Sequence, residues 1–152
     1  MKVCSACLVG IECKWDGKGK RIPKIKELFL NNKVLPLCAE QLGGLPTPRP
    51  CSGILNGVGA DVLDGKCIVV NEKGENITKQ FVKGAHQVLA LIKDLNINEA
   101  ILKKKSPCCG VGKTWQMSEV NHKFVNKLVE GDGVLTALLK RNGIKVISEE
   151  DI

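Results

Sequence analysis

The chain has 152 residues, of which 43% are hydrophobic. This length excludes two domains of ordinary size and allows one hydrophobic core, so residues 1–152 are expected to form a single domain. Residues 1–10 hold one basic side chain, Lys2, and no long apolar run, which argues against a signal peptide or a membrane span. We therefore expect a cytoplasmic protein, in a reducing compartment and without a membrane partner.

The 23 Lys and Arg residues outnumber the 16 Asp and Glu residues and give a net charge of +7. Such a surface attracts phosphates, nucleotides or RNA, although a solvated basic face that binds nothing explains the charge equally well. The chain has no Tyr, three Phe and two Trp, whereas proteins that bind long single strands stack the bases on aromatic side chains. A small phosphorylated ligand therefore fits the composition at least as well as a polynucleotide.

Apolar runs of strand length alternate with amphipathic helical segments along the chain. This pattern predicts an α/β fold: one Rossmann-like domain with a mostly parallel sheet of about four strands, helices on both faces and a small β-hairpin. In the first half, strands are expected at 2–5 and 33–37, with a helix at 23–32 between them. Residues 43–53 hold three prolines and three glycines, so they are expected to form a shaped loop.

The second half repeats the alternation. Residues 61–63 and 66–70 flank the turn-forming pair Asp64 and Gly65, which predicts the small hairpin. Asn76 is expected to cap a long helix that ends near residue 96, and Gly143 follows a last helix at 133–142. Strands at 99–102 and 145–147 complete the predicted sheet.

Three cysteines follow predicted strands at the point where each strand ends: Cys7, Cys38 and Cys109. The carboxyl ends of parallel strands share one edge of a sheet, so we expect these thiols to lie close together. Eight cysteines in a reducing compartment indicate metal binding or thiol chemistry more than disulfides. Three thiolates repel one another unless a metal stabilises them, and an incomplete ligand set leaves one metal position open for catalysis.

The other cysteines are weaker candidates. Cys4 forms a CxxC pair with Cys7, but a side chain inside a strand can also point into the core. Cys108 adjoins Cys109, and neighbouring side chains usually diverge, so only one of the two is expected to bind the metal. The three remaining cysteines are interpreted as buried small hydrophobic residues; they are Cys13, Cys51 and Cys67.

Several motifs, taken together, resemble the TudS-type thiouracil desulfidase family, a former domain of unknown function. They are SACLxG at 5–10, CKWDG at 13–17, the pair Cys38 and Glu40, GGLPTPRP at 43–50, SPCCG at 106–110, GDGVLTALL at 131–139 and SEE at 148–150. The resemblance therefore runs nearly from end to end. The chain departs from the usual family pattern at Ala39, at Cys108 and at the pair Lys14 and Trp15.

The resemblance implies that Cys7, Cys38 and Cys109 hold a 4Fe-4S cluster whose fourth iron has no protein ligand. It also implies a non-redox hydrolysis that converts a thiolated uracil into uracil or uridylate and hydrogen sulfide. Glu40 and Ser106 match the catalytic residues of the family. Without the resemblance, Ser106 would be interpreted as a loop cap and Glu40 as a solvated carboxylate.

Basic residues near these motifs are candidates for substrate binding. Arg49 in the proline-rich loop and Lys105 in the run 103–105 are suited to bind a phosphate, which favours a thiouridine monophosphate over the free base. A solvated strand end is the alternative interpretation of the lysines.

Two other functions stay open. The first is a non-catalytic module that binds zinc or a cluster; in the zinc form, Cys4, Cys7, Cys38 and Cys109 hold the metal in a closed site. The second is a basic RNA-binding factor for tRNA thio-modification, which we rank lower because aromatic residues are scarce. The sequence indicates nothing about the oligomeric state.

Overall fold

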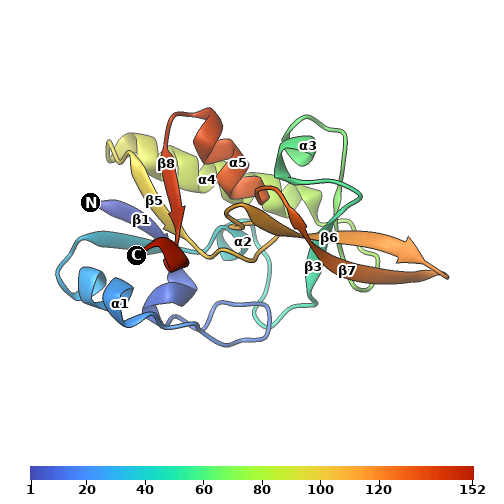
Figure 1. Cartoon of the computed structure of the whole chain (residues 1–152), viewed down its shortest axis with the longest axis horizontal. Coiled ribbons are helices and arrows are strands. Elements are labelled where there is room, and N and C mark those ends of the chain that lie inside the picture. Colours follow the sequence, from blue (N-terminus) through green and yellow to red (C-terminus); the bar gives the residue numbers. More distant parts are fainter.

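A four-stranded parallel sheet forms the centre of the protein, whose computed structural model describes residues 1–152 (Figure 1). Its strands run in the spatial order β2-β1-β5-β8. Their bounds are Lys2–Ser5 for β1, Val34–Leu37 for β2, Glu99–Leu102 for β5 and Lys145–Ser148 for β8. All three pairings are parallel. The predicted α/β fold with a parallel sheet of about four strands is therefore confirmed.

Successive side chains of this sheet point to opposite faces, and each face packs on helices. Val3 and Ala100 belong to a cluster with α4 (Thr78–Asp94) and α5 (Val134–Arg141). Cys4 and Ile101 belong to a second cluster with Ile25 of α1 (Pro23–Leu30). Burying each large apolar side chain contributes about 1.5–3 kcal/mol, so both faces stabilise the sheet. Helices on both faces are as predicted.

The long helix α4 follows the predicted apolar spacing, since Phe81, Ala85, Val88 and Ile92 are all buried. It begins one residue later than a cap at Asn76 would place it, but the Asn76 side chain still accepts the Thr78 N–H at 3.0 Å. None of the helices combines the length and the apolar character that crossing a membrane requires.

A second sheet lies beside the first, with the order β4-β3-β6-β7. Its strands are β3 (Ser52–Leu55), β4 (Val69–Asn71), β6 (Lys113–Val120) and β7 (Lys123–Glu130). The pair β6 and β7 forms a long hairpin that projects from the body of the molecule (Figure 1). Its turn residues Asn121 and His122 have φ values of 51° and 63°, as the tight turns of twisted hairpins require. This sheet was not predicted.

The hairpin predicted at residues 61–70 is wrong. Residues Gly59–Leu63 form a short helix, α3, and β4 pairs antiparallel with β3. Asp61 accepts the Val58 N–H at 2.9 Å and Val62 is buried, so capping and core packing favour a helical turn here. Asp64 and Gly65 end this helix. The predicted loop 43–53 is also shorter, because Ser52 and Gly53 are the first residues of β3.

The short helix α2 (Ala39–Leu42) follows β2 and rests directly on α4. A Cβ atom at Gly84 of α4 would overlap the Ala39 carbonyl, and one at Gly43 would overlap the Gln80 carbonyl. Only glycine allows two backbones to approach so closely. The residues at the start of α2 are thereby held against the core.

Candidate metal centre and active site

A cavity of about 310 Å³ opens where the carboxyl ends of β1, β2 and β5 meet the second sheet. Cys7 lines it from η1 (Ala6–Val9), directly after β1. Cys38 lines it from the residue before α2, and Cys109 from the turn after β5. The three cysteines that the sequence placed at strand ends therefore share the wall of one cavity.

Cys4 and Cys108 lie behind this wall. Cys4 is completely buried in β1 among apolar side chains, and burial together with the nearby Cys109 thiol raises its pKa to about 12. Cys108 is buried as well, and a hydrogen bond with Cys109 and desolvation raise its pKa well above the ordinary value. The zinc site considered above needs Cys4 at the cavity, where it does not lie.

Cys13 is the thiol whose position the sequence did not predict. It is buried, as expected, but it also lines the cavity. A hydrogen bond from Cys38 lowers the pKa of Cys13, whereas a hydrogen bond to Cys7 and burial outweigh that effect and raise the pKa to about 12. The same contact with Cys13 is the main reason that the pKa of Cys38 is raised, with burial second. The only available signal was the CKWDG motif.

No group of three metal-binding side chains is arranged to hold a single metal ion. In a cluster of several irons each thiolate binds a different iron, so the ligands do not have to meet at one point. The donor set is also all sulfur, which suits iron–sulfur chemistry. The residues present therefore fit the predicted cluster.

Lys103 lines the same wall of the cavity. Burial lowers the pKa of its ammonium group, and the nearby Cys7 thiol opposes this effect.

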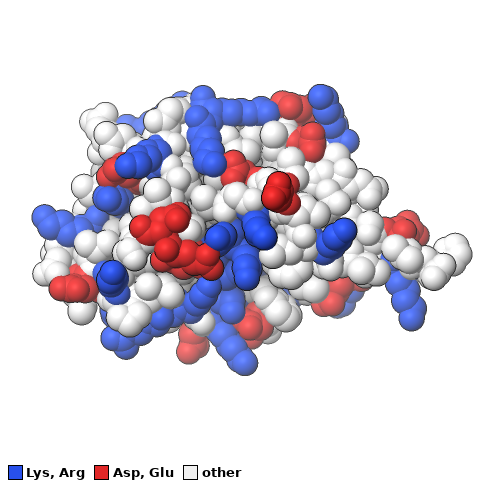
Figure 2. Space-filling model, viewed as in Figure 1, with Lys and Arg blue, Asp and Glu red and all other residues white.

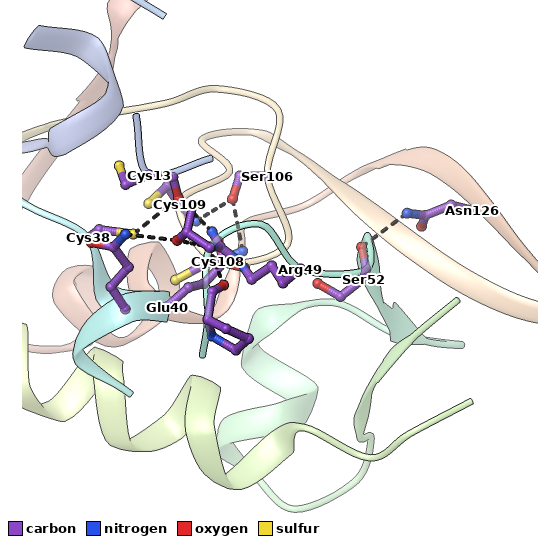
Figure 3. Close-up of polar contacts among 12 residues, drawn as sticks. Cys13, Cys38, Glu40, Arg49, Ser52, Ser106, Cys108, Cys109 and Asn126 are labelled. Carbon is purple, nitrogen blue, oxygen red and sulfur yellow. Dashed lines mark hydrogen bonds and ion pairs between the residues drawn. The ribbon is translucent and has the colours of Figure 1, made fainter. Parts of the chain in front are cut away.

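Glu40 and Arg49 form a buried ion pair beside the thiols (Figure 3). Glu40 lies on α2, and its Oε1 accepts from Nε of Arg49 at 3.3 Å. The remaining guanidinium donors bind the Pro46 carbonyl at 3.2 Å, the Thr47 hydroxyl at 3.0 Å and the Cys13 carbonyl at 2.9 Å. Burial lowers the pKa of Arg49, but the Glu40 carboxylate outweighs this and raises it. Arg49 thus connects the proline-rich loop, α2 and the Cys13 loop.

Ser106 occupies the first position of the SPCCG turn. Its hydroxyl oxygen accepts the backbone N–H groups of Cys108 at 3.1 Å and of Cys109 at 3.0 Å (Figure 3). The Ser106 carbonyl accepts from the Thr114 hydroxyl at 3.0 Å. The serine is therefore the loop cap that its position before Pro107 suggested, and the hydrogen of its hydroxyl is not used by any of these contacts. Lys105, next to it, is exposed and also lines the cavity.

The second sheet and the loop after η1 supply the other wall, which the sequence did not predict. Trp115 of β6 and Asn126 of β7 line the cavity, as does Trp15 from the loop. The Asn126 side-chain nitrogen donates to the Ser52 carbonyl at 3.0 Å, while its buried Oδ1 has no hydrogen-bond partner. These are the only two tryptophans of the chain, and both lie at this cavity.

Comparison with known proteins relates this arrangement to one family. A sequence model of the 2-thiouracil desulfurase family matches residues 3–151. The uncharacterized protein YbbK of Bacillus subtilis strain 168 is 40% identical over 152 residues, which is 100% of this chain and 97% of YbbK. The solved structure of the [4Fe-4S]-dependent thiouracil desulfidase TudS matches with a TM-score of 0.83 and 36% identity, over 99% of this chain and 91% of TudS. The chain belongs to the 2-thiouracil desulfurase family, as its motifs predicted.

Proposed function

We propose that this protein is an iron–sulfur-dependent thiouracil desulfidase. It replaces the sulfur of a thiolated uracil by an oxygen atom from water and releases hydrogen sulfide, with no net oxidation or reduction. The observation that carries this proposal is the common cavity of Cys7, Cys38 and Cys109, in a chain whose fold and family match those of TudS. The three thiolates would hold a 4Fe-4S cluster.

The bound cluster would supply a thiophilic iron, free of protein ligands, that polarises the C=S bond as a Lewis acid. Glu40 would accept a proton from the attacking water, because it is the carboxylate that lines the cavity beside the thiols. Arg49 would keep the Glu40 carboxylate correctly oriented through the buried ion pair. Arg49 is thus proposed to act on substrate mainly through Glu40.

Ser106 would act as a hydrogen-bond donor. Its oxygen is fixed by two backbone N–H groups, so the hydroxyl hydrogen is available to the substrate or to the departing sulfur. The same two contacts hold the turn that carries Cys109. Ser106 therefore stabilises the turn that carries the proposed ligand Cys109 and also places a hydrogen-bond donor at the cavity.

The substrate ring would lie against the tryptophans. Trp15 and Trp115 offer aromatic surfaces to a planar pyrimidine, and such stacking contributes about 1–3 kcal/mol per base. Lys103 and Lys105 at the same cavity would bind a phosphate, so we propose a thiouridine monophosphate as a substrate in addition to the free base.

A tRNA substrate has less support. On the face in Figure 2, the basic side chains that gather near the centre and the lower edge are bordered by acidic ones. Several lysines are paired with carboxylates, including Lys20 with Glu149 at 2.8 Å and Lys104 with Glu150 at 2.7 Å.

All eight cysteines are unpaired, which agrees with the proposed cytoplasmic location of the protein.

A substrate panel tests this proposal. The protein is purified and reconstituted without oxygen, and sulfide release is measured from 2-thiouracil, 4-thiouracil, the corresponding monophosphates and a thiolated tRNA. We expect a brown protein that releases sulfide from the small substrates, with the monophosphates preferred. A protein that holds a complete cluster yet releases no sulfide from any of them would contradict the proposal.

A further inference from the structure

Cys13 lies directly beside two of the proposed cluster ligands. It is 2% exposed and belongs to the same buried cluster as Cys7, against which Cys38 packs. All three cysteines line the same cavity, and the Sγ of Cys38 donates to the Cys13 carbonyl at 3.9 Å. The Cys13 thiol is therefore placed next to the sulfurs of Cys7 and Cys38.

The loop that carries Cys13 is firmly built. The Lys14 N–H donates to the Lys18 carbonyl at 3.1 Å, and the Lys20 N–H returns to the Cys7 carbonyl at 2.8 Å. The Cys13 carbonyl accepts from Nη2 of Arg49 at 2.9 Å. A buried guanidinium group is thus used to hold this backbone at the cavity, which a cysteine that merely fills space does not need.

We propose that Cys13 is a positioning residue of the metal centre, whose S–H group donates a hydrogen bond to the ligand sulfur of Cys7 or Cys38. The inference rests on the proposed function, because it assumes that these two cysteines bind the cluster. It adds a fourth thiol to the site, one that binds no iron. The Arg49 contact fixes where this donor points, through the backbone of Cys13.

The expected consequence is electronic. A hydrogen bond to a ligand sulfur withdraws electron density from the cluster, which raises its reduction potential and makes its iron a stronger Lewis acid. In a desulfidase, a stronger Lewis acid polarises the C=S bond of the substrate more effectively. Cys13 would therefore assist the reaction without touching the substrate.

The test compares Cys13→Ala, Cys13→Ser and the control Cys67→Ala in anaerobically reconstituted protein. Cys67 is a suitable control because its thiol donates to the Asn56 carbonyl at 3.8 Å, outside the cavity. Iron and sulfide content and the midpoint potential of the cluster are measured. We expect full cluster content in all variants, a more negative potential in Cys13→Ala, an intermediate value in Cys13→Ser and no shift in Cys67→Ala.

Two outcomes would overturn the inference. An unchanged potential in Cys13→Ala would show that no hydrogen bond reaches the cluster, and loss of iron with a native circular dichroism spectrum would make Cys13 a ligand. If Cys13→Ala does not fold, Cys13→Val decides, since valine has a similar volume but no hydrogen-bond donor, and a potential equal to wild type would exclude the thiol donor. A wild-type protein with a full cluster but no sulfide release would refute the proposed reaction and leave the potential shift as a separate result.

Discussion

Arg49 and Glu40 form an ion pair of 3.3 Å in which the side chains are only 5% and 16% exposed. The ion pair fixes the orientation of the Glu40 carboxylate beside the cavity. The planar guanidinium also reaches the Cys13 carbonyl at 2.9 Å, which a lysine ammonium cannot do from the same position. The pair therefore joins the proposed proton acceptor to the wall of the proposed metal centre.

Arg49→Lys tests this connection. The lysine keeps the positive charge but cannot bind Glu40 and the Cys13 carbonyl at once, so Glu40 loses its fixed orientation. We expect kcat to fall by about 100-fold, the cost of displacing a reacting group by roughly an ångström, while iron content is retained. Arg141→Lys is the matched control, because Arg141 pairs with Asp64 at 2.9 Å on the surface, and it should leave kcat unchanged. Equal rates in the two variants would contradict the role of Arg49.

Ser106→Ala separates catalysis from cluster binding. The variant loses the hydroxyl donor, and we expect kcat to fall by about 100- to 1,000-fold with the brown colour retained. It also leaves the N–H groups of Cys108 and Cys109 without their acceptor, which should lower the free energy of unfolding by about 1 kcal/mol. Denaturant titration and sulfide release measure both effects. Ser118→Ala on the hairpin is the control, and a full rate in Ser106→Ala would remove Ser106 from the reaction.

The two tryptophans allow direct measurement of substrate binding. Because the chain has no others, Trp115→Phe leaves Trp15 as the single fluorescent reporter, and Trp15→Phe leaves Trp115. We expect uracil to quench both reporters. Trp115→Ala should raise KM about tenfold or more, as loss of one stacking surface predicts, with a smaller effect on kcat. Quenching of neither tryptophan by uracil would place the base elsewhere.

The buried thiol of Cys4 predicts how the stability of the metal-free protein depends on pH. Its pKa is about 12 in the folded chain, against about 8.5 for a free thiol. A raised folded-state pKa contributes stability that is complete below the unfolded pKa and is lost as the pH rises toward the folded value. Urea unfolding of the metal-free protein should therefore show decreasing stability above about pH 8.5. In Cys4→Ala the part of this decrease that comes from Cys4 should vanish. If the free energy of unfolding fell equally steeply with pH in the variant and in the wild type, the raised pKa of Cys4 would be contradicted.

The parallel sheet was predictable because its strands are short apolar runs with local signals at their ends. Ala100, Ile101 and Leu102 are all buried, so this strand is apolar on both faces of the sheet. The hairpin of β6 and β7 gave no such signal. The apolar residues of β7 fall in adjacent pairs, Phe124 with Val125 and Leu128 with Val129, so the alternation of apolar and polar residues that identifies strands is missing from the sequence.

Some residues of the proposed site could likewise be predicted from the sequence, and others could not. Cys7, Cys38 and Cys109 could be placed together because each follows a strand of one parallel sheet. The position of Cys13 depends on Arg49, 36 residues away, and that of Trp115 on a strand pairing that local pattern does not indicate. Such long-range contacts are decided by tertiary packing and not by spacing along the chain.

Cys109→Ala tests whether the three cysteines at the cavity hold the cluster that the reaction needs; iron content and sulfide release from 4-thiouracil are measured, with Cys67→Ala as control. We expect Cys109→Ala to lose both the cluster and the activity while keeping a native circular dichroism spectrum, and Cys67→Ala to retain both. Release of sulfide by Cys109→Ala at the wild-type rate would contradict this expectation.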